Sequence, residues 1–137
     1  MSCNKHHLET EREEQIIEKN MKYAELETKV LDWAQERGIL DKATPYAQAK
    51  KTFEEVEELI EAVEAQSKGK TEFVNSKGKI VNTKEEIKDA LGDIFVTIII
   101  GAELQGLNLE DCLESAYNVI SKRTGSMIDG QFVKNEK

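Results

Sequence analysis

The chain has 137 residues, of which 39% are hydrophobic and 34% charged, and its formal net charge is −8. This length suits one domain with its own core, and the two cysteines suit a reducing cytoplasm rather than a disulfide-stabilised fold. The acidic charge argues against binding to polymeric nucleic acid, and no apolar run approaches the roughly 18 residues of a membrane span. A single proline and only 8 glycines favour helices.

The chain begins with a charged segment, residues 1–20, which is expected to be an N-terminal extension or a loose helix. From residue 21 to residue 37, apolar residues recur at helical spacing and predict one amphipathic helix that Gly38 ends. The whole chain, residues 1–137, is expected to form a single all-α domain. Its helical core would span residues 21–126, and its C-terminal tail would span residues 127–137.

A second helix is predicted from Thr44 to about Ser67. Thr44 has the side chain of an N-cap, and Pro45 suits the first helical position, where no backbone N–H is needed. Along this helix an apolar stripe recurs at helical spacing and predicts the face that packs on the core. The stripe consists of Val56, Leu59, Ile60 and Val63.

Two short segments lack the helical pattern. Residues 72–75 and 79–81 flank Ser76-Lys77-Gly78 and predict a hairpin or a loop. In the tail, Asp129-Gly130 lies between apolar residues and predicts a second, small hairpin.

Two more helices complete the predicted fold. Thr83 and Glu86 have the spacing of a capping box, so a third helix is expected from Thr83 to about Gln105. A fourth helix is expected to begin at Asn108 and to end near Gly125. Four helices with short connections predict an all-α, four-helix bundle-like fold.

The third helix raises a chemical question, because Asp93 lies inside the apolar stretch "KDALGDIFVTIII". At 100° per residue, Glu86, Asp89 and Asp93 fall on one face within about 60°. The opposite face is expected to be the core face of a central helix; it carries Leu91, Ile94, Phe95 and Ile98. An ionised carboxylate away from water needs a partner, and no lysine or arginine lies one turn from Asp93. The partner must be another segment, a metal or solvent.

The second helix offers such a partnership through Glu55 and Glu58, which are three residues apart and therefore neighbours on its surface. Glu55 borders the apolar stripe. Carboxylate oxygens from two helices suit Mg²⁺ or Mn²⁺, which also bind substrate phosphates. A plain solvated surface stays open as the alternative, because glutamates on a helix usually face water and Glu86 already has a capping role.

These residues resemble those of the MazG-type all-α nucleoside triphosphate pyrophosphohydrolases, whose pattern is EExxE on one helix and ExxD on the next. Here "EEVEE" supplies Glu54, Glu55 and Glu58, and "ALGDIFV" supplies Asp93 as the closing acid. The segment before them, "QAKKTFEEVEEL", carries Gln48 and Lys51 at the positions of the family's glutamine and lysine.

The resemblance also extends to both ends of the chain and covers about residues 22–134. Trp33 and the "ERGI" that follows it look like the family's first helix. The segment "NVISKRTGSMIDG" is similar to the tail of small phage and bacterial MazG-like proteins, with Asn118, Lys122 and Arg123 at its polar positions.

The sequence departs from the family at one important position. Ala90 occupies the place of the acid three residues before Asp93. Asp89, one residue earlier, is the preferred substitute because it lies only about 40° from Asp93 around the helix. The alternative is that Glu86 and Asp89 form the motif, which would leave Asp93 stranded among apolar residues.

The resemblance implies that the chain cleaves an NTP or dNTP to a monophosphate and pyrophosphate, a reaction that suits nucleotide-pool house-cleaning. Metal ligands would be Glu55, Glu58, Asp89 and Asp93, holding Mg²⁺ or Mn²⁺. Glu54 or Glu55 would orient the attacking water. The substrate-binding candidates are Gln48, Lys51, Asn118, Lys122, Arg123 and Trp33, although a lone tryptophan is more often part of a core.

The family also implies a homodimer or homotetramer. The base and sugar of the nucleotide stay open, with dUTP, dCTP and phosphoribosyl-ATP as alternatives. Because Ala90 departs from the motif, a different class of function also stays open: a non-catalytic helical protein that uses the fold for oligomerisation or partner binding.

Overall fold

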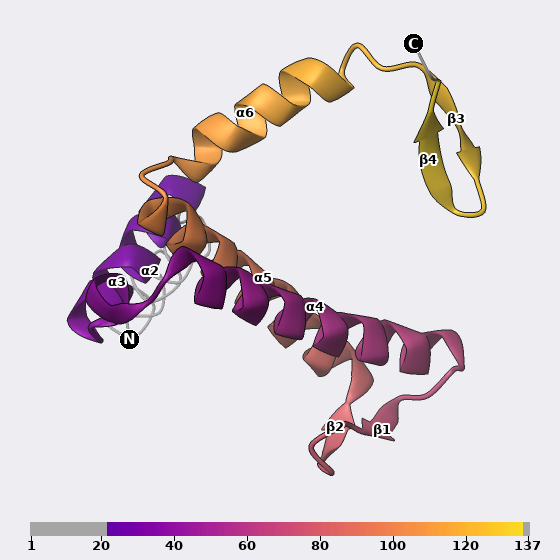
Figure 1. Cartoon of the computed structure of the whole chain (residues 1–137). Helices are drawn as coiled ribbons and strands as arrows, with labels where there is room; N and C mark the ends of the chain where they lie inside the picture. The colour runs from indigo at the N-terminus through magenta and orange to yellow at the C-terminus, as the bar shows by residue number, and fades with distance from the viewer. Residues whose placement is uncertain (1–21, 136–137) are drawn as a thin grey trace, which may run out of the picture. The chain divides into compact units, whose positions relative to one another are not determined.

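The computed structural model describes residues 22–135, so the predictions for residues 1–20 lie outside the described residues. The chain divides into two compact units, residues 1–42 and residues 43–137. The described part is mainly helical, with two small antiparallel hairpins (Figure 1). Within residues 22–135 no single helix is long and apolar enough to cross a membrane; only α5 with α6, a pair bent by 102°, passes by length and composition.

The first unit contains helix α2, Tyr23–Glu36, and the single turn α3, Ile39–Lys42. The predicted end of the first helix is confirmed, because Gly38 follows it with a φ of 75°, a conformation that glycine adopts without strain. The sequence pattern did not predict α3. It is too short to show a helical period, which explains why periodicity missed it.

Helix α4 spans Pro45–Ser67, as predicted. The Thr44 hydroxyl accepts a hydrogen bond from the backbone N–H of Ala47 at 3.1 Å, and Pro45 occupies the first turn. The start of this helix is therefore fixed by local chemistry that the sequence displays directly.

A hairpin connects α4 to the next helix and confirms the first of the two predicted hairpins. Strand β1, Glu72–Val74, pairs antiparallel with β2, Ile80–Asn82, so that Phe73 lies opposite Val81. Both of these side chains are half-buried, and the hairpin contacts both α4 and the helix that follows it.

Helix α5 spans Thr83–Leu104, but its cap differs from the prediction. Asn82 is the N-cap, and its side-chain oxygen accepts the N–H of Glu85 at 3.0 Å. The buried Thr83 hydroxyl instead donates to the carbonyl of Lys70 at 2.8 Å. The predicted capping box of Thr83 and Glu86 is therefore wrong, because a residue one position earlier reaches the free N–H groups. This leaves Glu86 without a capping role.

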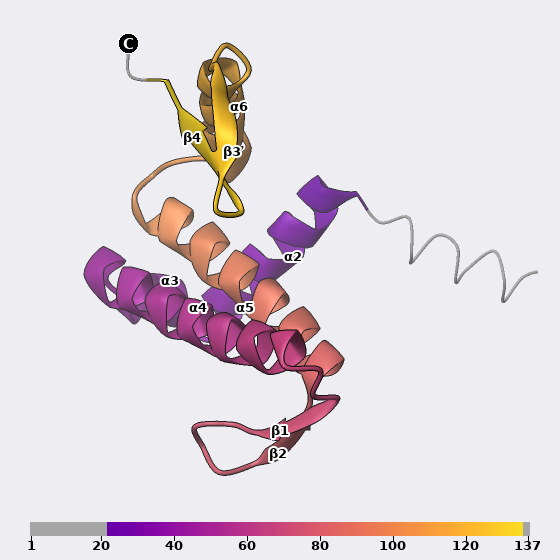
Figure 2. The ribbon, with the colours of Figure 1, turned by 90° about the vertical axis from the view of Figure 1, so that its right-hand side faces the viewer.

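Helices α4 and α5 lie side by side and antiparallel, with the β1–β2 hairpin at the end where α4 finishes and α5 begins (Figures 1 and 2). The Thr52 hydroxyl donates to the Thr97 hydroxyl at 2.8 Å, and the Gln48 amide donates to the Thr97 carbonyl at 3.4 Å. These bonds join the first half of α4 to the second half of α5, which sets the register of the pair.

The face through which these two helices pack differs from the predicted one. The buried residues include small ones, namely Ala62, Ala65, Ala90 and Thr97. The larger apolar residues of the predicted stripes are half-buried or exposed, and the exposed ones are Ile60, Val63, Leu91, Phe95 and Ile98. Two large residues of α5, Ile99 and Ile100, are buried as well, so the core combines small and large side chains.

Helix α6, Leu109–Ile120, begins as predicted, since the Asn108 side chain accepts the N–H of Asp111 at 3.3 Å. Its predicted end near Gly125 is wrong, because the helix ends at Ile120 and Gly125 begins a strand. Strands β3, Gly125–Ile128, and β4, Gln131–Lys134, form the second predicted hairpin around Asp129-Gly130, both with positive φ. Every residue from 110 to 135 is exposed. The structure thus confirms a mainly helical fold but does not confirm a four-helix bundle.

Candidate active site

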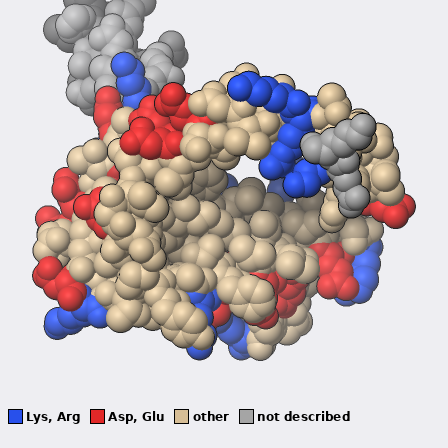
Figure 3. All heavy atoms as spheres, turned by 45° about the horizontal axis from the view of Figure 1, so that its top comes forward, with Lys and Arg blue, Asp and Glu red and all other residues tan. Residues whose placement is uncertain are grey.

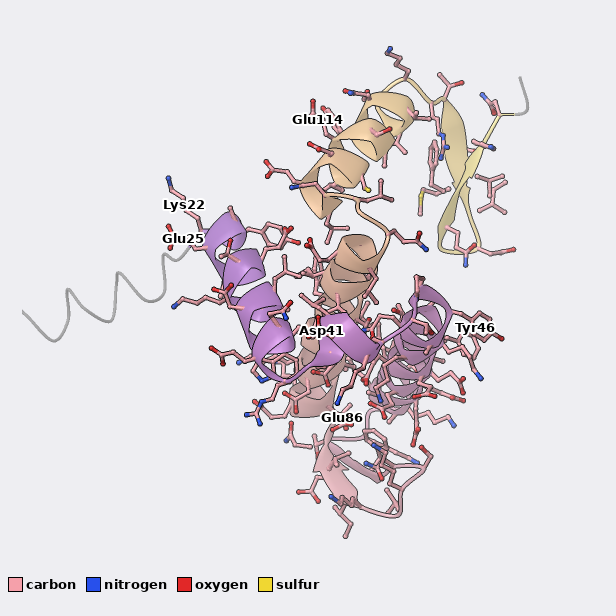
Figure 4. All side chains as sticks on the ribbon, turned by 60° about the vertical axis from the view of Figure 1, so that its left-hand side comes forward. Lys22, Glu25, Asp41, Tyr46, Glu86 and Glu114 are labelled. Carbon is pink, nitrogen blue, oxygen red and sulfur yellow. The ribbon has the colours of Figure 1, made fainter. Side chains whose placement is uncertain are left out.

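The antiparallel packing of α4 and α5 brings together the acids that the sequence placed on two separate helices. Glu55 and Glu58 come from α4, while Glu86, Asp89 and Asp93 come from α5. Glu86 lies at the end of α5 next to the β1–β2 hairpin (Figure 4). The charge of Glu58 raises the pKa of Glu55, of Glu86 and of Asp93, so this carboxylate is close to all three.

Glu55 is the most buried charged residue of the described part, with 7% of its surface exposed. Its Oε2 atom is buried and has no hydrogen-bond partner among the described residues. Its Oε1 atom lies 3.5 Å from Nζ of Lys51. Burial raises the pKa of Glu55, and the charges of Glu58 and Asp93 raise it further, while Lys51 lowers it. Glu55 thus presents a free, poorly solvated oxygen, which a cation would satisfy.

Asp93 is exposed, so the expectation that its carboxylate lies away from water is wrong. Partial burial, Asp89 and Glu58 raise the pKa of Asp93, and Lys51 opposes them. No lysine or arginine within residues 22–135 forms an ion pair with it. The exposure of Asp93 also bears on the alternative motif of Glu86 and Asp89. That motif would not leave Asp93 among apolar groups, because Asp93 is exposed.

Glu58 lies at the hairpin end of the acidic group. Its Oε1 atom is 3.4 Å from Nζ of Lys77, which comes from the β1–β2 loop. A cavity of about 40 Å³ separates the two helices from this loop, enough for a water molecule or a small ion. It is lined by Glu58, Glu61, Phe73, Asn75, Ser76, Lys77 and Glu86. Burial and the charges of Glu58 and Asp89 raise the pKa of Glu86, against the effect of Lys77.

The carboxylates suit a hard divalent cation in their chemistry, but not yet in their geometry. All are oxygen donors, they repel one another, and Glu55 has an unsatisfied buried oxygen. Within residues 22–135, however, no group of three or more His, Cys, Asp or Glu side chains is arranged to hold a metal ion. Metal binding would therefore require these carboxylate side chains to turn toward one another. Ala90 is buried with 2% of its surface exposed, so this position supplies no ligand.

The substrate-binding candidates divide into two groups. Lys51 lies at the site, since its Nζ atom is 3.5 Å from Glu54 as well as from Glu55. Burial alone would lower the pKa of Lys51, but these two carboxylates raise it. Gln48 is half-buried, and its amide already contacts the backbone of α5.

The remaining candidates lie on α6, just beyond its end, or on α2. Asn118, Lys122 and Arg123 are exposed at and beyond the end of α6, and among the described residues no hydrogen bond or ion pair links them to the acids. Trp33 is an exposed residue of α2, in the first compact unit.

Sequence reasoning missed Lys77, which forms an ion pair with Glu58. Its segment was correctly predicted as a turn, but a turn lysine has no local pattern that reveals which helix it will contact. The signal that could have found it is a basic residue in the short connection between the two acidic helices.

The mainly helical fold is consistent with the comparison of the sequence with known families. Residues 43–127 match the family model of the MazG nucleotide pyrophosphohydrolase domain. This match covers most of the chain, and the chain belongs to the MazG family. The match begins at the same residue as the second compact unit, which contains the whole acidic group. No curated protein and no solved structure matches the chain significantly.

Proposed function

We propose that this MazG protein hydrolyses a nucleoside or deoxynucleoside triphosphate to the monophosphate and pyrophosphate, with Mg²⁺ or Mn²⁺ as its cofactor. Removal of surplus or non-standard nucleotides from the cellular pool is the role that we propose for this reaction. The family supports nucleotide pyrophosphohydrolysis in general. The observation that carries the proposal is the crowded group of carboxylates around Glu58, with the unpaired, buried oxygen of Glu55 at its inner edge.

The proposed metal ligands are Glu55, Glu58, Asp89 and Asp93. A divalent ion bound there would neutralise phosphate charge and help to activate water. Glu58, Asp89 and Asp93 each raise the pKa of a neighbouring carboxyl group, so this group of carboxylates would gain from any added positive charge. Glu86 is a rival ligand, since it shares these neighbours and is not occupied as a cap.

The chain's other residues would position the substrate. The ammonium of Lys51 lies beside Glu54 and Glu55, where it can donate to a phosphate oxygen. Glu54 is exposed and is our first candidate to orient the attacking water, with Glu55 as the second. We keep Gln48, Asn118, Lys122, Arg123 and Trp33 as candidates for contacts with the nucleotide.

The test is pyrophosphate release from a panel of NTPs and dNTPs, measured with Mg²⁺ and with EDTA. We expect metal-dependent turnover of at least one nucleotide. Asp93→Asn should lower kcat/KM by about 100-fold or more, because the neutral amide binds a hard cation poorly and no longer balances its charge.

Asp32→Asn is the matched control, since Asp32 is an exposed aspartate on α2, outside the acidic group. It should retain wild-type turnover. If no nucleotide is hydrolysed in the presence of Mg²⁺ or Mn²⁺, or if the two variants behave alike, the proposed function is wrong.

A non-catalytic role in partner binding is the second candidate, and two observations favour it. Ala90 is buried where the family motif has an acid, and the acids of the described part are not arranged to hold a metal. Calorimetry separates the two candidates without any substrate. The enzyme predicts binding of Mn²⁺ that Asp93→Asn weakens, whereas the non-catalytic protein predicts no binding that depends on this carboxylate.

We also propose that the protein works as a homodimer or homotetramer. Helix α6 carries an apolar stripe at helical spacing, made by Leu109, Leu113, Ala116, Tyr117 and Ile120, of which all but the half-buried Leu109 are exposed. On the face shown in Figure 3, acidic side chains gather in separate groups and uncharged residues cover much of the surface between them. Exposed apolar surface of this kind is typical of a contact with another chain.

A further inference from the structure

The β1–β2 loop carries a cation to the acidic group that neither helix supplies. Nζ of Lys77 lies 3.4 Å from Oε1 of Glu58, a proposed metal ligand. Lys51 lies at the other proposed ligand of α4, Glu55. Each proposed ligand of α4 therefore has one lysine beside it, and only Lys77 comes from outside the two helices.

The loop is held in shape by hydrogen bonds that centre on Asn75. The Asn75 side-chain oxygen accepts the N–H groups of Lys77 and Lys79, each at 3.0 Å. The backbone N–H of Asn75 donates to the carbonyl of Lys79 at 2.8 Å, and Gly78 takes the φ of 79° that the turn requires. These hydrogen bonds fix the backbone of Lys77, whereas its long side chain can contact any partner within its reach.

The ion pair of Lys77 with Glu58 is of a kind that exchanges easily. The Lys77 side chain is 72% exposed and that of Glu58 is 32% exposed. Exposed pairs of this sort contribute little to stability, because water and salt screen them. The contact therefore matters for where it lies and not for its strength. The Lys77 ammonium lies where a divalent cation would bind Glu58, and it also lowers the pKa of the neighbouring Glu86.

We propose that Lys77 is a substrate-positioning residue, whose ammonium neutralises Glu58 in the metal-free protein and binds the phosphate chain of the nucleotide once a divalent cation takes Glu58. This inference rests on the proposed function. A dication competes successfully with an exposed ammonium for a carboxylate, so metal binding frees Lys77. Because the loop backbone is fixed, the released Lys77 ammonium stays at the site, where it binds the triphosphate of the nucleotide.

The test measures two dissociation constants by calorimetry, without turnover. The first is for Mn²⁺ alone. The second is for a nucleoside triphosphate with a methylene group between its α- and β-phosphates, added in the presence of saturating Mn²⁺. In Lys77→Met we expect Mn²⁺ to bind about two- to five-fold more tightly, because its competitor is gone. The nucleotide should bind about ten-fold more weakly, because a charge-assisted contact is lost.

Two variants serve as controls. Lys79→Met removes a lysine of the same exposed loop that forms no ion pair with the acids among the described residues, and it should match the wild type in both measurements. Lys77→Arg keeps the charge and should restore nucleotide binding, which a merely structural role of the side chain would not predict.

The outcomes separate this inference from the proposed function. Wild-type protein that binds neither Mn²⁺ nor the nucleotide contradicts the proposed function, and the inference fails with it. Wild-type binding of both, with either constant unchanged in Lys77→Met, overturns the inference alone. The same change in Lys79→Met as in Lys77→Met also overturns it, because the effect would then be one of net charge.

Discussion

Glu55 sits in an environment that disfavours its charged form, and this has a consequence for stability that can be measured. Burial, Glu58 and Asp93 all raise its pKa, and only Lys51 acts against them. Glu86 and Asp93 have raised pKa values as well, with burial as the first cause and neighbouring carboxylates as the next. The folded, metal-free protein therefore holds protons more tightly at this site than the unfolded chain does.

The first prediction concerns pH. An acid whose pKa is raised by folding stabilises the folded state at low pH, and this contribution is lost as the pH rises from the unfolded value of 4.5 through the folded one. In EDTA, Glu55→Gln should raise the free energy of unfolding at pH 7.5 by about 1 kcal/mol, because it removes a buried charge. The gain over the wild type should shrink toward pH 4.5. Denaturant unfolding at several pH values measures both.

The control for this prediction is Glu57→Gln, an exposed glutamate on the same helix. It should show little difference from the wild type at either pH. A Glu55→Gln protein that is less stable than the wild type at pH 7.5 would mean that the ion pair with Lys51 outweighs the cost of burying the carboxylate.

At the scale of single residues, the sequence predicted which acids would meet but not how each would be solvated. The spacing of Glu55 and Glu58 was enough to place them on neighbouring turns of one helix. The exposure of Asp93 could not be read from its apolar neighbours, since it depends on which face of α5 contacts α4. The pairing of Lys77 with Glu58 depends on how a loop folds back onto a helix, and no local pattern encodes that.

At the scale of elements, the α4–α5 pair is joined by a hydroxyl contact as well as by small apolar residues. Thr97 is buried with 5% of its surface exposed; its hydroxyl donates to the carbonyl of Ile94 at 2.7 Å and accepts from Thr52 at 2.8 Å. This contact fixes the register that places Glu55 and Glu58 opposite the acids of α5.

The second prediction tests this contact. Thr97→Val keeps the shape of the side chain but removes the hydroxyl, so it should lower the free energy of unfolding by about 1 kcal/mol. The loss should stay small because Thr52 can still donate to the carbonyl of Gln48, 3.1 Å away. Thr28→Val is the control, since the exposed Thr28 hydroxyl bonds only within its own helix. Equal losses in the two variants would argue against a contact that joins the helices.

The elements themselves were predictable where local chemistry decides them. Thr44, Pro45 and Asn108 fixed two helix starts, and Asp129-Gly130 fixed a turn. The N-cap of α5 was misjudged by one residue, although the helix does begin at Thr83, because Asn82 and Thr83 are both good caps and the contact of Thr83 with Lys70 lies outside the helix. The core faces were misjudged because hydrophobicity favours large residues, whereas several of the buried residues of α4 and α5 are small.

At the scale of the whole molecule, the surface of α6 has implications for assembly. Leu113 is 69% exposed and Tyr117 is 62% exposed, on the same stripe of this helix. Leaving such a stripe in water forgoes hydrophobic stabilisation of about 25 cal/mol per Å² of apolar surface, which a second copy of the chain would recover.

The third prediction follows from the proposed oligomer. Wild-type protein should elute as a dimer or tetramer in size-exclusion chromatography with light scattering, and Leu113→Glu should shift it toward the monomer. Ser115→Glu introduces the same side chain on another face of α6 and should leave the assembly unchanged. A wild-type monomer at micromolar concentration would contradict the proposal.

Ala90 is buried at the position where this chain departs from the ExxD motif of its family. Ala90 is buried in α5 next to Asp89 in the sequence, so a glutamate introduced there would add a further negative charge beside carboxylates that already repel one another. Without a bound ion, that substitution would lower the free energy of unfolding by several kcal/mol, on the order of the cost of a buried unpaired charge. By keeping a methyl group at this point, the chain avoids burying that additional charge when it folds without an ion.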